Sequence, residues 1–226
     1  MKPAFKAAYK AACSERPCFG GPDQDERDWW RYTVKLALEY CGCHPSDKDF
    51  DRYFRRVYQF YGSAEGYGVL DDAGRLVDAL AKRPEILLGI TSNTARRTTD
   101  NVLPMLGLSE QFSFFACAQD CGAEKPDKRI FEAALESARF WLPDLEPHQV
   151  LHIGDSLEAD LCGARAFGFE ALLLDRSDNP RVTKYQDWLQ GPEYDGKCDV
   201  DIESSTIKSL DDILGLVPHF ARPGAE

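Results

Sequence analysis

The first 62 residues carry apolar and aromatic side chains three or four positions apart, which is the spacing of one face of an α-helix. This pattern predicts a helix before Pro17, a second helix over about residues 25–41 and a third that begins near Ser46. Ser46 with Asp49 resembles a capping box, in which side chains satisfy the free N–H groups of a helix start. We therefore expect this part of the chain to be all-helical.

Beyond Gly68 the pattern changes to short apolar runs that alternate with helical segments. The expected strands cover residues 86–91, 112–118, 150–153 and 171–174, and the expected helices cover residues 72–82, 94–103, 127–139, 157–167 and 209–216. Strands that alternate with helices of this length predict a parallel sheet with helices on both faces. The predicted fold class is therefore α/β, with a helical part before the sheet.

The composition suits a folded protein that binds neither nucleic acid nor a membrane. Of its 226 residues 43% are hydrophobic, enough for the core of one large domain or of a domain with a smaller insertion. No apolar run approaches the ~18 residues of a membrane span. The formal net charge of −11 would repel nucleic acid and anionic membranes. A phosphorylated small molecule is compatible with this charge, because a local cation or metal ion can dominate a small cleft.

The eight cysteines are scattered, and no pair of C-x-x-C motifs provides a zinc site. Cys117, Cys121 and Cys162 lie in apolar or helical stretches, which is typical of reduced thiols. We therefore expect a reducing compartment, the cytoplasm, with the nucleus or an organelle as alternatives. The first 19 residues carry basic side chains and one acid, Glu15, a composition that fits an amphipathic helix or a transit peptide.

Three of the expected strands are followed by polar residues that suit a phosphate and a metal ion. Ser92 and Asn93 come after the first strand, at a helix start whose free N–H groups attract anions. Lys125 follows the second strand and Asp155 the third, with Asp160 about one helical turn further on. Ligands bind at the carboxyl ends of strands in open α/β sheets, so these residues form a candidate site. Singly, Ser92 and Asp155 also fit helix caps, and Lys125 an ordinary surface lysine.

Three segments resemble motifs two, three and four of the haloacid dehalogenase-like hydrolases: Ile90-Thr91-Ser92-Asn93, Glu124-Lys125-Pro126-Asp127 and Gly154-Asp155-Ser156 through Asp160. The resemblance covers residues 70–180 closely, and the helical part is similar to the cap of subfamily I. It is strongest to a eukaryotic group whose cap carries a comparable basic and aromatic helix. The resemblance divides the chain into a partial helical cap, residues 1–66, and a core, residues 67–226. It implies that the core is Rossmann-like, with a parallel sheet and helices on both faces.

The same resemblance implies an Mg²⁺-dependent phosphatase that acts on a small phosphorylated metabolite through an aspartyl-phosphate. Ser92, together with Asn93, would bind the phosphoryl oxygens, and Lys125 would offset the negative charge of phosphate and nucleophile. Asp155 would ligate Mg²⁺. Asp160 would orient either Lys125 or the groups around the metal ion.

The family's first motif does not occur in these 226 residues. It is an apolar strand that ends in D-x-D-x-T, supplies the nucleophilic aspartate and lies between the strands of motifs two and four. Burial of about five apolar side chains on such a strand would contribute ~1.5–3 kcal/mol each. Asp71-Asp72 and Asp175 follow apolar runs, but they lie at the wrong places in the chain to replace it.

We therefore expect a chain that begins inside the cap, with Met1 an internal methionine of a longer protein or a wrongly assigned start. As written, it would be inactive and poorly folded. A non-catalytic binding protein on the same fold is the alternative, although Lys125 and Asp155 would then have no reason to persist together. A nucleotide-binding or methyl-transfer domain is disfavoured, because the chain lacks a G-x-G-x-x-G run.

Overall fold

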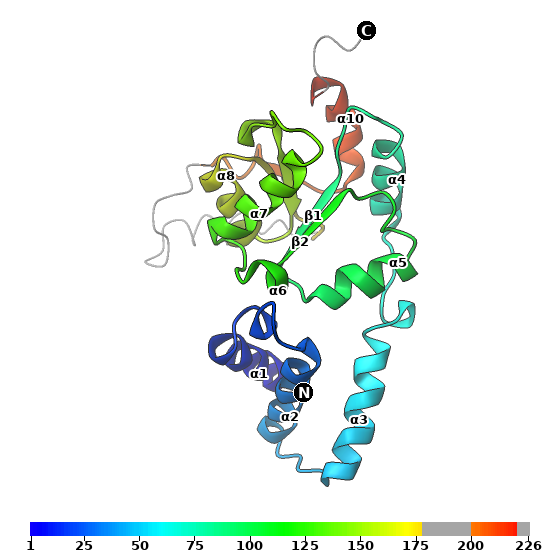
Figure 1. The fold of residues 1–226 in the computed structure, drawn as a ribbon, viewed down its shortest axis with the longest axis vertical. Coiled ribbons are helices and arrows are strands. Elements are labelled where there is room, and N and C mark those ends of the chain that lie inside the picture. The colour runs from blue at the N-terminus through cyan, green and yellow to red at the C-terminus, as the bar shows by residue number, and fades with distance from the viewer. Residues whose placement is uncertain (178–199, 221–226) are drawn as a thin grey trace. The chain divides into compact units, whose positions relative to one another are not determined.

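The computed structural model describes residues 1–177 and 200–220, which form helices and short strands arranged in two compact units (Figure 1). The first unit consists of Met1–Gly68, Ile90–Glu110 and Phe115–Glu124, and the second of Val69–Gly89, Gln111–Phe114 and Lys125–Glu226. The division into residues 1–66 and 67–226 rests on the resemblance and stays a prediction. Each compact unit is described by itself below.

The N-terminal part of the first unit is all-helical, as its spacing predicts. It contains α1 (Lys2–Glu15), η1 (Cys18–Gly20), α2 (Glu26–Tyr40), α3 (Asp47–Phe60) and η2 (Ala64–Gly66). Asp25 caps α2, because its side chain accepts a hydrogen bond from Arg27 N–H over 2.8 Å. Ser46 caps α3 by accepting a hydrogen bond from Asp49 N–H over 3.2 Å, which confirms the predicted helix start.

An aromatic core around Trp29, which is 2% exposed, joins α1 to α2. The Trp29 ring lies edge-on to Tyr9, with the ring centroids 5.4 Å apart, and packs against Phe19 at 4.9 Å. Ala8 and Ala12 on the facing side of α1 are completely buried. Their small side chains let the two helices approach closely enough for the rings to interlock.

The first unit continues with η3 (Thr98–Val102), α5 (Leu103–Met105) and α6 (Ala118–Cys121). The helix expected over residues 94–103 begins at Arg96 and contains a π-helical turn. The spacing therefore predicted this helix correctly in type but placed its start two residues early.

The described strands form two separate sheets. One contains β1 (Gly89–Ser92) and β2 (Phe114–Cys117), and the other contains β3 (Leu151–Gly154), β4 (Glu170–Leu174) and β5 (Thr206–Ile207). β4 pairs in parallel with β3 and with β5, which confirms the predicted α/β class. Ala171 and Leu173 of β4 are completely buried, whereas all four residues of β3 are half-buried. Within residues 1–177 and 200–220, β3 has β4 as its one strand neighbour.

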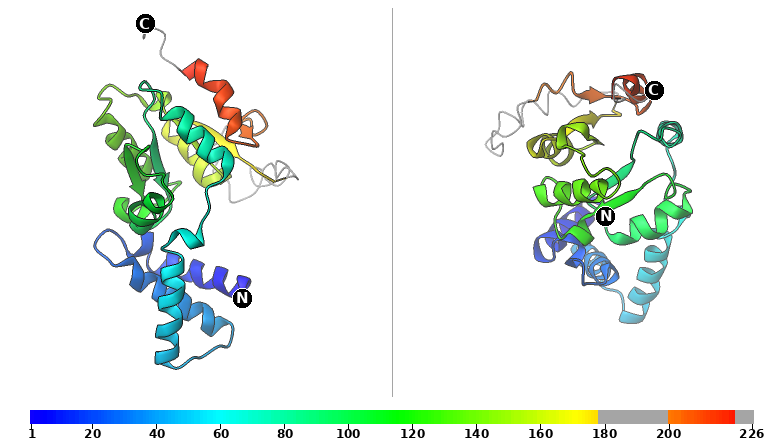
Figure 2. Two further views of the ribbon diagram at one scale, coloured as in Figure 1. Left: turned by 90° about the vertical axis from the view of Figure 1, so that its right-hand side faces the viewer. Right: turned by 45° about the horizontal axis from the view of Figure 1, so that its top comes forward.

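The helices of the second unit supply its core. They are α4 (Asp71–Leu80), α7 (Lys128–Arg139), η4 (Pro147–Gln149), η5 (Leu157–Cys162), α8 (Gly163–Phe167) and α10 (Asp211–Phe220). α4 and α10 lie side by side (Figure 2) and bury Leu76 and Ile213 together. Phe131 of α7 is completely buried, and its ring centroid lies 6.0 Å from that of Phe167 and 5.9 Å from that of Phe169. These contacts hold α7 and α8 against each other.

The prediction of a reduced thiol at Cys162 is wrong, because this residue is disulfide-bonded. An apolar neighbourhood in the sequence does not reveal whether another cysteine lies close in space. The cysteines described as free are Cys13, Cys18, Cys41, Cys43, Cys117 and Cys121. In the described ranges, no helix has both the length and the apolar character needed to cross a membrane.

Candidate functional site

The loop between β3 and η5 carries the acidic residues that the sequence analysis selected. β3 ends at Gly154, and Asp155 follows it as an exposed residue. Ser156 caps η5, since its hydroxyl accepts a hydrogen bond from Ala159 N–H over 3.1 Å. Asp160 is buried in the first turn of η5. The predicted order of strand, loop and helix is confirmed.

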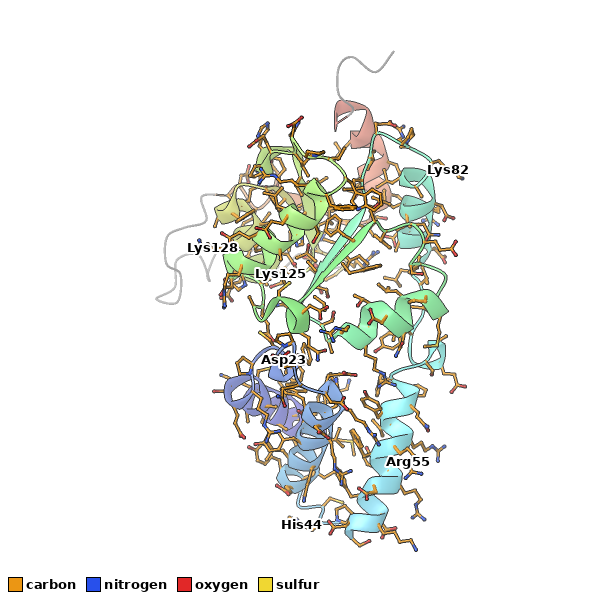
Figure 3. The ribbon with its side chains drawn as sticks, in the orientation of Figure 1. Asp23, His44, Arg55, Lys82, Lys125 and Lys128 are labelled. Carbon is orange, nitrogen blue, oxygen red and sulfur yellow. The ribbon has the colours of Figure 1, made fainter. Side chains whose placement is uncertain are left out.

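Asp160 is the centre of a hydrogen-bonded group in the second unit. Its Oδ1 accepts a hydrogen bond from Lys125 Nζ over 2.7 Å and lies 2.9 Å from His152 Nε2. Its Oδ2 accepts a hydrogen bond from Ser156 N–H over 2.9 Å. Lys125, labelled in Figure 3, lies in the segment between α6 and α7. The side chains of Lys125 and His152 are each 11% exposed, so water screens the Lys125–Asp160 ion pair weakly.

The charge of Asp160 follows from these contacts. Burial alone would raise the pKa of the Asp160 carboxyl. The hydrogen bond with His152, the positive charge of Lys125 and the Ser156 N–H outweigh burial and hold that pKa well below its usual range. Asp160 is therefore ionised at neutral pH, and its charge anchors the Lys125 ammonium group.

Two glycines leave the space that this arrangement needs. A Cβ atom on Gly154 would clash with the Asp160 carboxylate, so a side chain at this position would displace the partner of Lys125. A Cβ atom on Gly163 would lie 2.9 Å from Cβ of Pro126, the residue that follows Lys125. The Lys125–Pro126 peptide bond is cis. The missing side chains thus leave room for the Asp160 carboxylate at Gly154 and for Pro126 at Gly163.

Asp155, the predicted magnesium ligand, is accessible to solvent. It is exposed at the end of β3, and within residues 1–177 and 200–220 no hydrogen bond or ion pair engages its side chain. Mg²⁺ is usually held by one or two carboxylates, with water and substrate phosphate as further ligands. The described part of the chain contains no cluster of three or more His, Cys, Asp or Glu side chains that could hold a metal ion. Asp155 thus offers a carboxylate at this position, and its role as a magnesium ligand stays a prediction.

Ser92 and Asn93 lie at the end of β1 and in the loop that follows it, and they belong to the first unit. Lys125, Asp155 and Asp160 belong to the second unit. The structure thus brings Lys125 and Asp160 into contact. In the sequence, the loop that carries Asp155 lies between these two residues. A single site that also includes Ser92 and Asn93 stays a prediction.

Gln119 of α6 fixes the loop after Ser92 within the first unit. The side chain is 1% exposed, and its Oε1 accepts a hydrogen bond from Arg96 N–H over 2.9 Å. Its Nε2 donates to the carbonyl of Gln24 over 2.9 Å, and its backbone N–H donates to the carbonyl of Thr94 over 3.4 Å. One buried side chain therefore ties the loop after β1 to the segment before α2.

The roles of His152 and Gln119 do not follow from the sequence pattern. Each is a polar residue within or next to an apolar strand, and hydrophobic periodicity assigns no role to such a position. The available signal was that a buried polar side chain needs hydrogen-bond partners.

Two of the carboxylates that follow apolar runs, Asp72 and Asp175, have structural partners. Asp72 is 5% exposed and accepts hydrogen bonds from Arg176 Nη1 over 2.5 Å and from Leu210 N–H over 2.9 Å. Asp175 is 4% exposed and accepts a hydrogen bond from Ser177 N–H over 3.1 Å. These contacts stabilise buried carboxylates, and a nucleophile needs access to its substrate.

The parallel sheet, its helices and the buried lysine–aspartate pair define a Rossmann-like α/β protein with a charged group at the end of a strand. A family model described as haloacid dehalogenase-like hydrolase matches residues 11–168. The chain therefore belongs to the haloacid dehalogenase-like hydrolases, as its motifs predict.

Curated relatives indicate one group within this family. Haloacid dehalogenase-like hydrolase domain-containing protein 3 from Bos taurus is 33% identical over 172 residues, which cover 76% of this chain and 65% of the relative. The Mus musculus protein is 31% identical over 179 residues, covering 79% and 68%. The Drosophila melanogaster rhythmically expressed gene 2 protein is 27% identical over 188 residues, covering 80% and 71%. The chain thus spans about two thirds of the length of the relatives it matches.

Solved structures confirm the fold. A HAD phosphatase from Thermococcus onnurineus is similar with a TM-score of 0.57 and 20% identity, over 94% of this chain and 80% of that one. The magnesium-bound HAD-hydrolase YfnB from Bacillus subtilis gives a TM-score of 0.62 and 21% identity, over 95% and 82%.

Proposed function

We propose that this chain is the cap and core portion of an Mg²⁺-dependent phosphatase that acts on a small phosphorylated metabolite. We further propose that the 226 residues alone do not turn over substrate, because they contain no D-x-D-x-T segment to supply the nucleophile. The observation that carries the proposal is the buried ion pair of Lys125 and Asp160, 2.7 Å apart. A phosphatase of this family needs a fixed positive charge at that place.

The ion pair gives Lys125 a defined task. A phosphoryl group carries negative charge before and during its transfer, and a fixed cation in a water-poor site stabilises that charge. Asp160 is ionised and holds the ammonium group in one place, so no reorganisation is needed when phosphate arrives. Ser92 and Asn93 would donate hydrogen bonds to the phosphoryl oxygens from the end of β1.

Asp155 would hold the magnesium ion. When bound, Mg²⁺ would supply positive charge to the phosphoryl oxygens. The exposed position of Asp155 leaves it accessible to an ion that arrives with its water and its substrate. Support also comes from the relative YfnB, whose crystal structure contains magnesium.

The test compares this chain with a version extended at its N-terminus by a strand that ends in D-x-D-x-T. Both are assayed with p-nitrophenyl phosphate in the presence of Mg²⁺. We expect hydrolysis from the extended version alone, and we expect it to disappear when the first aspartate of the added motif is changed to asparagine. Equal activity in both versions would refute the claim that the nucleophile is missing.

The same experiment addresses the alternative of a non-catalytic binding protein. Absence of hydrolysis in the extended version, combined with retained binding of inorganic phosphate by calorimetry, would favour that alternative. A Lys125→Ala control in the extended version should abolish hydrolysis if Lys125 has the proposed task.

A further inference from the structure

We propose that His152 is a positioning residue that acts on Lys125 through Asp160. This inference rests on the proposed function, because it assigns a further role within the same group of side chains. Neither the motifs nor the spacing of the sequence pointed to His152, which lies inside the apolar strand β3.

The geometry shows that one carboxylate oxygen serves both residues. Asp160 Oδ1 lies 2.7 Å from Lys125 Nζ and 2.9 Å from His152 Nε2, while Oδ2 accepts the Ser156 N–H over 2.9 Å. An ionised carboxylate has lone pairs for several donors and can rotate about its own axis. Donors on both oxygens prevent that rotation. The contact with His152 gives Oδ1 a second fixed neighbour beside the ammonium group, so we infer that it sets the direction in which Oδ1 meets Lys125 Nζ.

The position of the His152 ring is itself well determined. Its backbone is paired with Ala171 in the β3–β4 ladder. The ring of Phe131 meets the imidazole edge-on, with ring centroids 5.6 Å apart and an interplanar angle of 88°. The His152 side chain is 11% exposed. Strand and aromatic neighbour thus make the imidazole a rigid support for the carboxylate.

The proton arrangement follows from the charge of Asp160. An ionised carboxylate only accepts hydrogen bonds, so His152 Nε2 must carry the hydrogen that it shares with Oδ1. His152 therefore supplies a donor at one defined atom. A replacement keeps the function only if it brings an N–H group to the same point.

This requirement distinguishes a role of His152 in positioning Lys125 from a role in packing alone. Glutamine can place its amide nitrogen near the position of Nε2, whereas the shorter asparagine reaches only the position of Nδ1. His152→Gln should therefore preserve the position of Lys125, and His152→Asn should not. Both substitutes are neutral and polar, so burial of a polar group is the same in each.

The experiment observes the Lys125 ammonium group directly in the 226-residue chain. The protein is labelled with ¹⁵N-lysine, and the Lys125 Nζ resonance is assigned by its absence in Lys125→Ala. A buried, hydrogen-bonded ammonium group exchanges slowly enough to give a resolved signal. We expect the signal in the unmodified chain and in His152→Gln, and its loss in His152→Asn.

Ile153→Ala is the matched control, because it perturbs β3 beside His152 but removes no contact of Asp160. It should retain the Lys125 signal even if it unfolds more easily than His152→Asn. A retained signal in His152→Asn, or a loss in both His152→Asn and Ile153→Ala, would overturn the proposal. Because this readout needs no turnover, its failure is distinct from a failure of the phosphatase assay, which would count against the proposed function.

Discussion

Replacing Gly154 by alanine should break the candidate site through one specific clash. The neighbours that a Cβ atom would meet there are Cγ and both carboxylate oxygens of Asp160, all too close for real atoms. Asp160 or the β3 backbone would have to move. Either movement separates the carboxylate from Lys125, His152 and Ser156.

The size of the effect can be worked from these contacts. Forcing an extra methyl group into a packed site costs about 1–3 kcal/mol. A hydrogen bond to a charged group contributes about 1.5–3 kcal/mol. If the clash breaks one of the three contacts of Asp160, the free energy of unfolding should fall by about 2.5–6 kcal/mol. Gly74→Ala is the matched control, since a Cβ atom there lies 3.8 Å from Val69. In helix α4 that change should stabilise by about 0.5–1 kcal/mol.

Urea unfolding monitored by circular dichroism measures both variants. A double-mutant cycle with Asp160→Ala then isolates the clash, because alanine at position 160 removes the three atoms that lie nearest to the new methyl group. In that background Gly154→Ala should change the free energy of unfolding by less than about 1 kcal/mol. Asp160→Asn is unsuitable for this cycle, because its amide occupies the same space. An equally large effect of Gly154→Ala in both backgrounds would refute the reasoning.

Three further predictions concern the charges and hydrogen bonds of the two units. The Asp160 pKa lies below its ordinary value, so the stability that this carboxylate contributes is fully present above about pH 4 and declines as the pH falls further. Asp160→Asn should therefore flatten the decline of the urea midpoint at acid pH. An unchanged pH profile of the midpoint would contradict this prediction. Gln119→Leu leaves the Arg96 N–H and the Gln24 carbonyl without this hydrogen-bond partner, so the free energy of unfolding should fall by about 1–3 kcal/mol for each group. An unaltered urea midpoint would show that the buried amide is dispensable. Asp155→Ala should change the free energy of unfolding by less than about 0.5 kcal/mol, since the side chain is exposed. The same change should abolish Mg²⁺ binding measured by calorimetry. Intact Mg²⁺ binding would exclude Asp155 as the ligand.

The helices and their starts were the part of the fold that the sequence predicted best. Apolar spacing alone predicted α2 and α3, and the Ser46–Asp49 pair predicted where α3 begins. These features are local, since a helix is stabilised by residues within a turn of each other. The same reasoning identified the strand, loop and helix around Asp155, because apolar runs and loop residues alternate there.

The contacts of the candidate site could not be predicted in this way, because they join residues far apart in the chain. Lys125 and Asp160 are 35 residues apart; the strand ends predicted that they share a site, but only the family resemblance suggested that one orients the other. The role of Gly154 was equally hidden. A glycine before an aspartate suggests a turn, whereas the structure shows that its missing side chain leaves room for a carboxylate six residues later.

The edge of β3 that faces away from β4 has a consequence for how this chain behaves in concentrated solution. Glu170 N–H donates to the Val150 carbonyl over 2.9 Å, so in a parallel ladder Leu151 and Ile153 direct their N–H and C=O groups away from β4. No strand in residues 1–177 and 200–220 pairs with that side, and β3 carries no lysine or proline to discourage pairing with another molecule. Dimers or larger species seen by size-exclusion chromatography would then arise from the open backbone edge. Such species should dissociate when a single added strand occupies that edge.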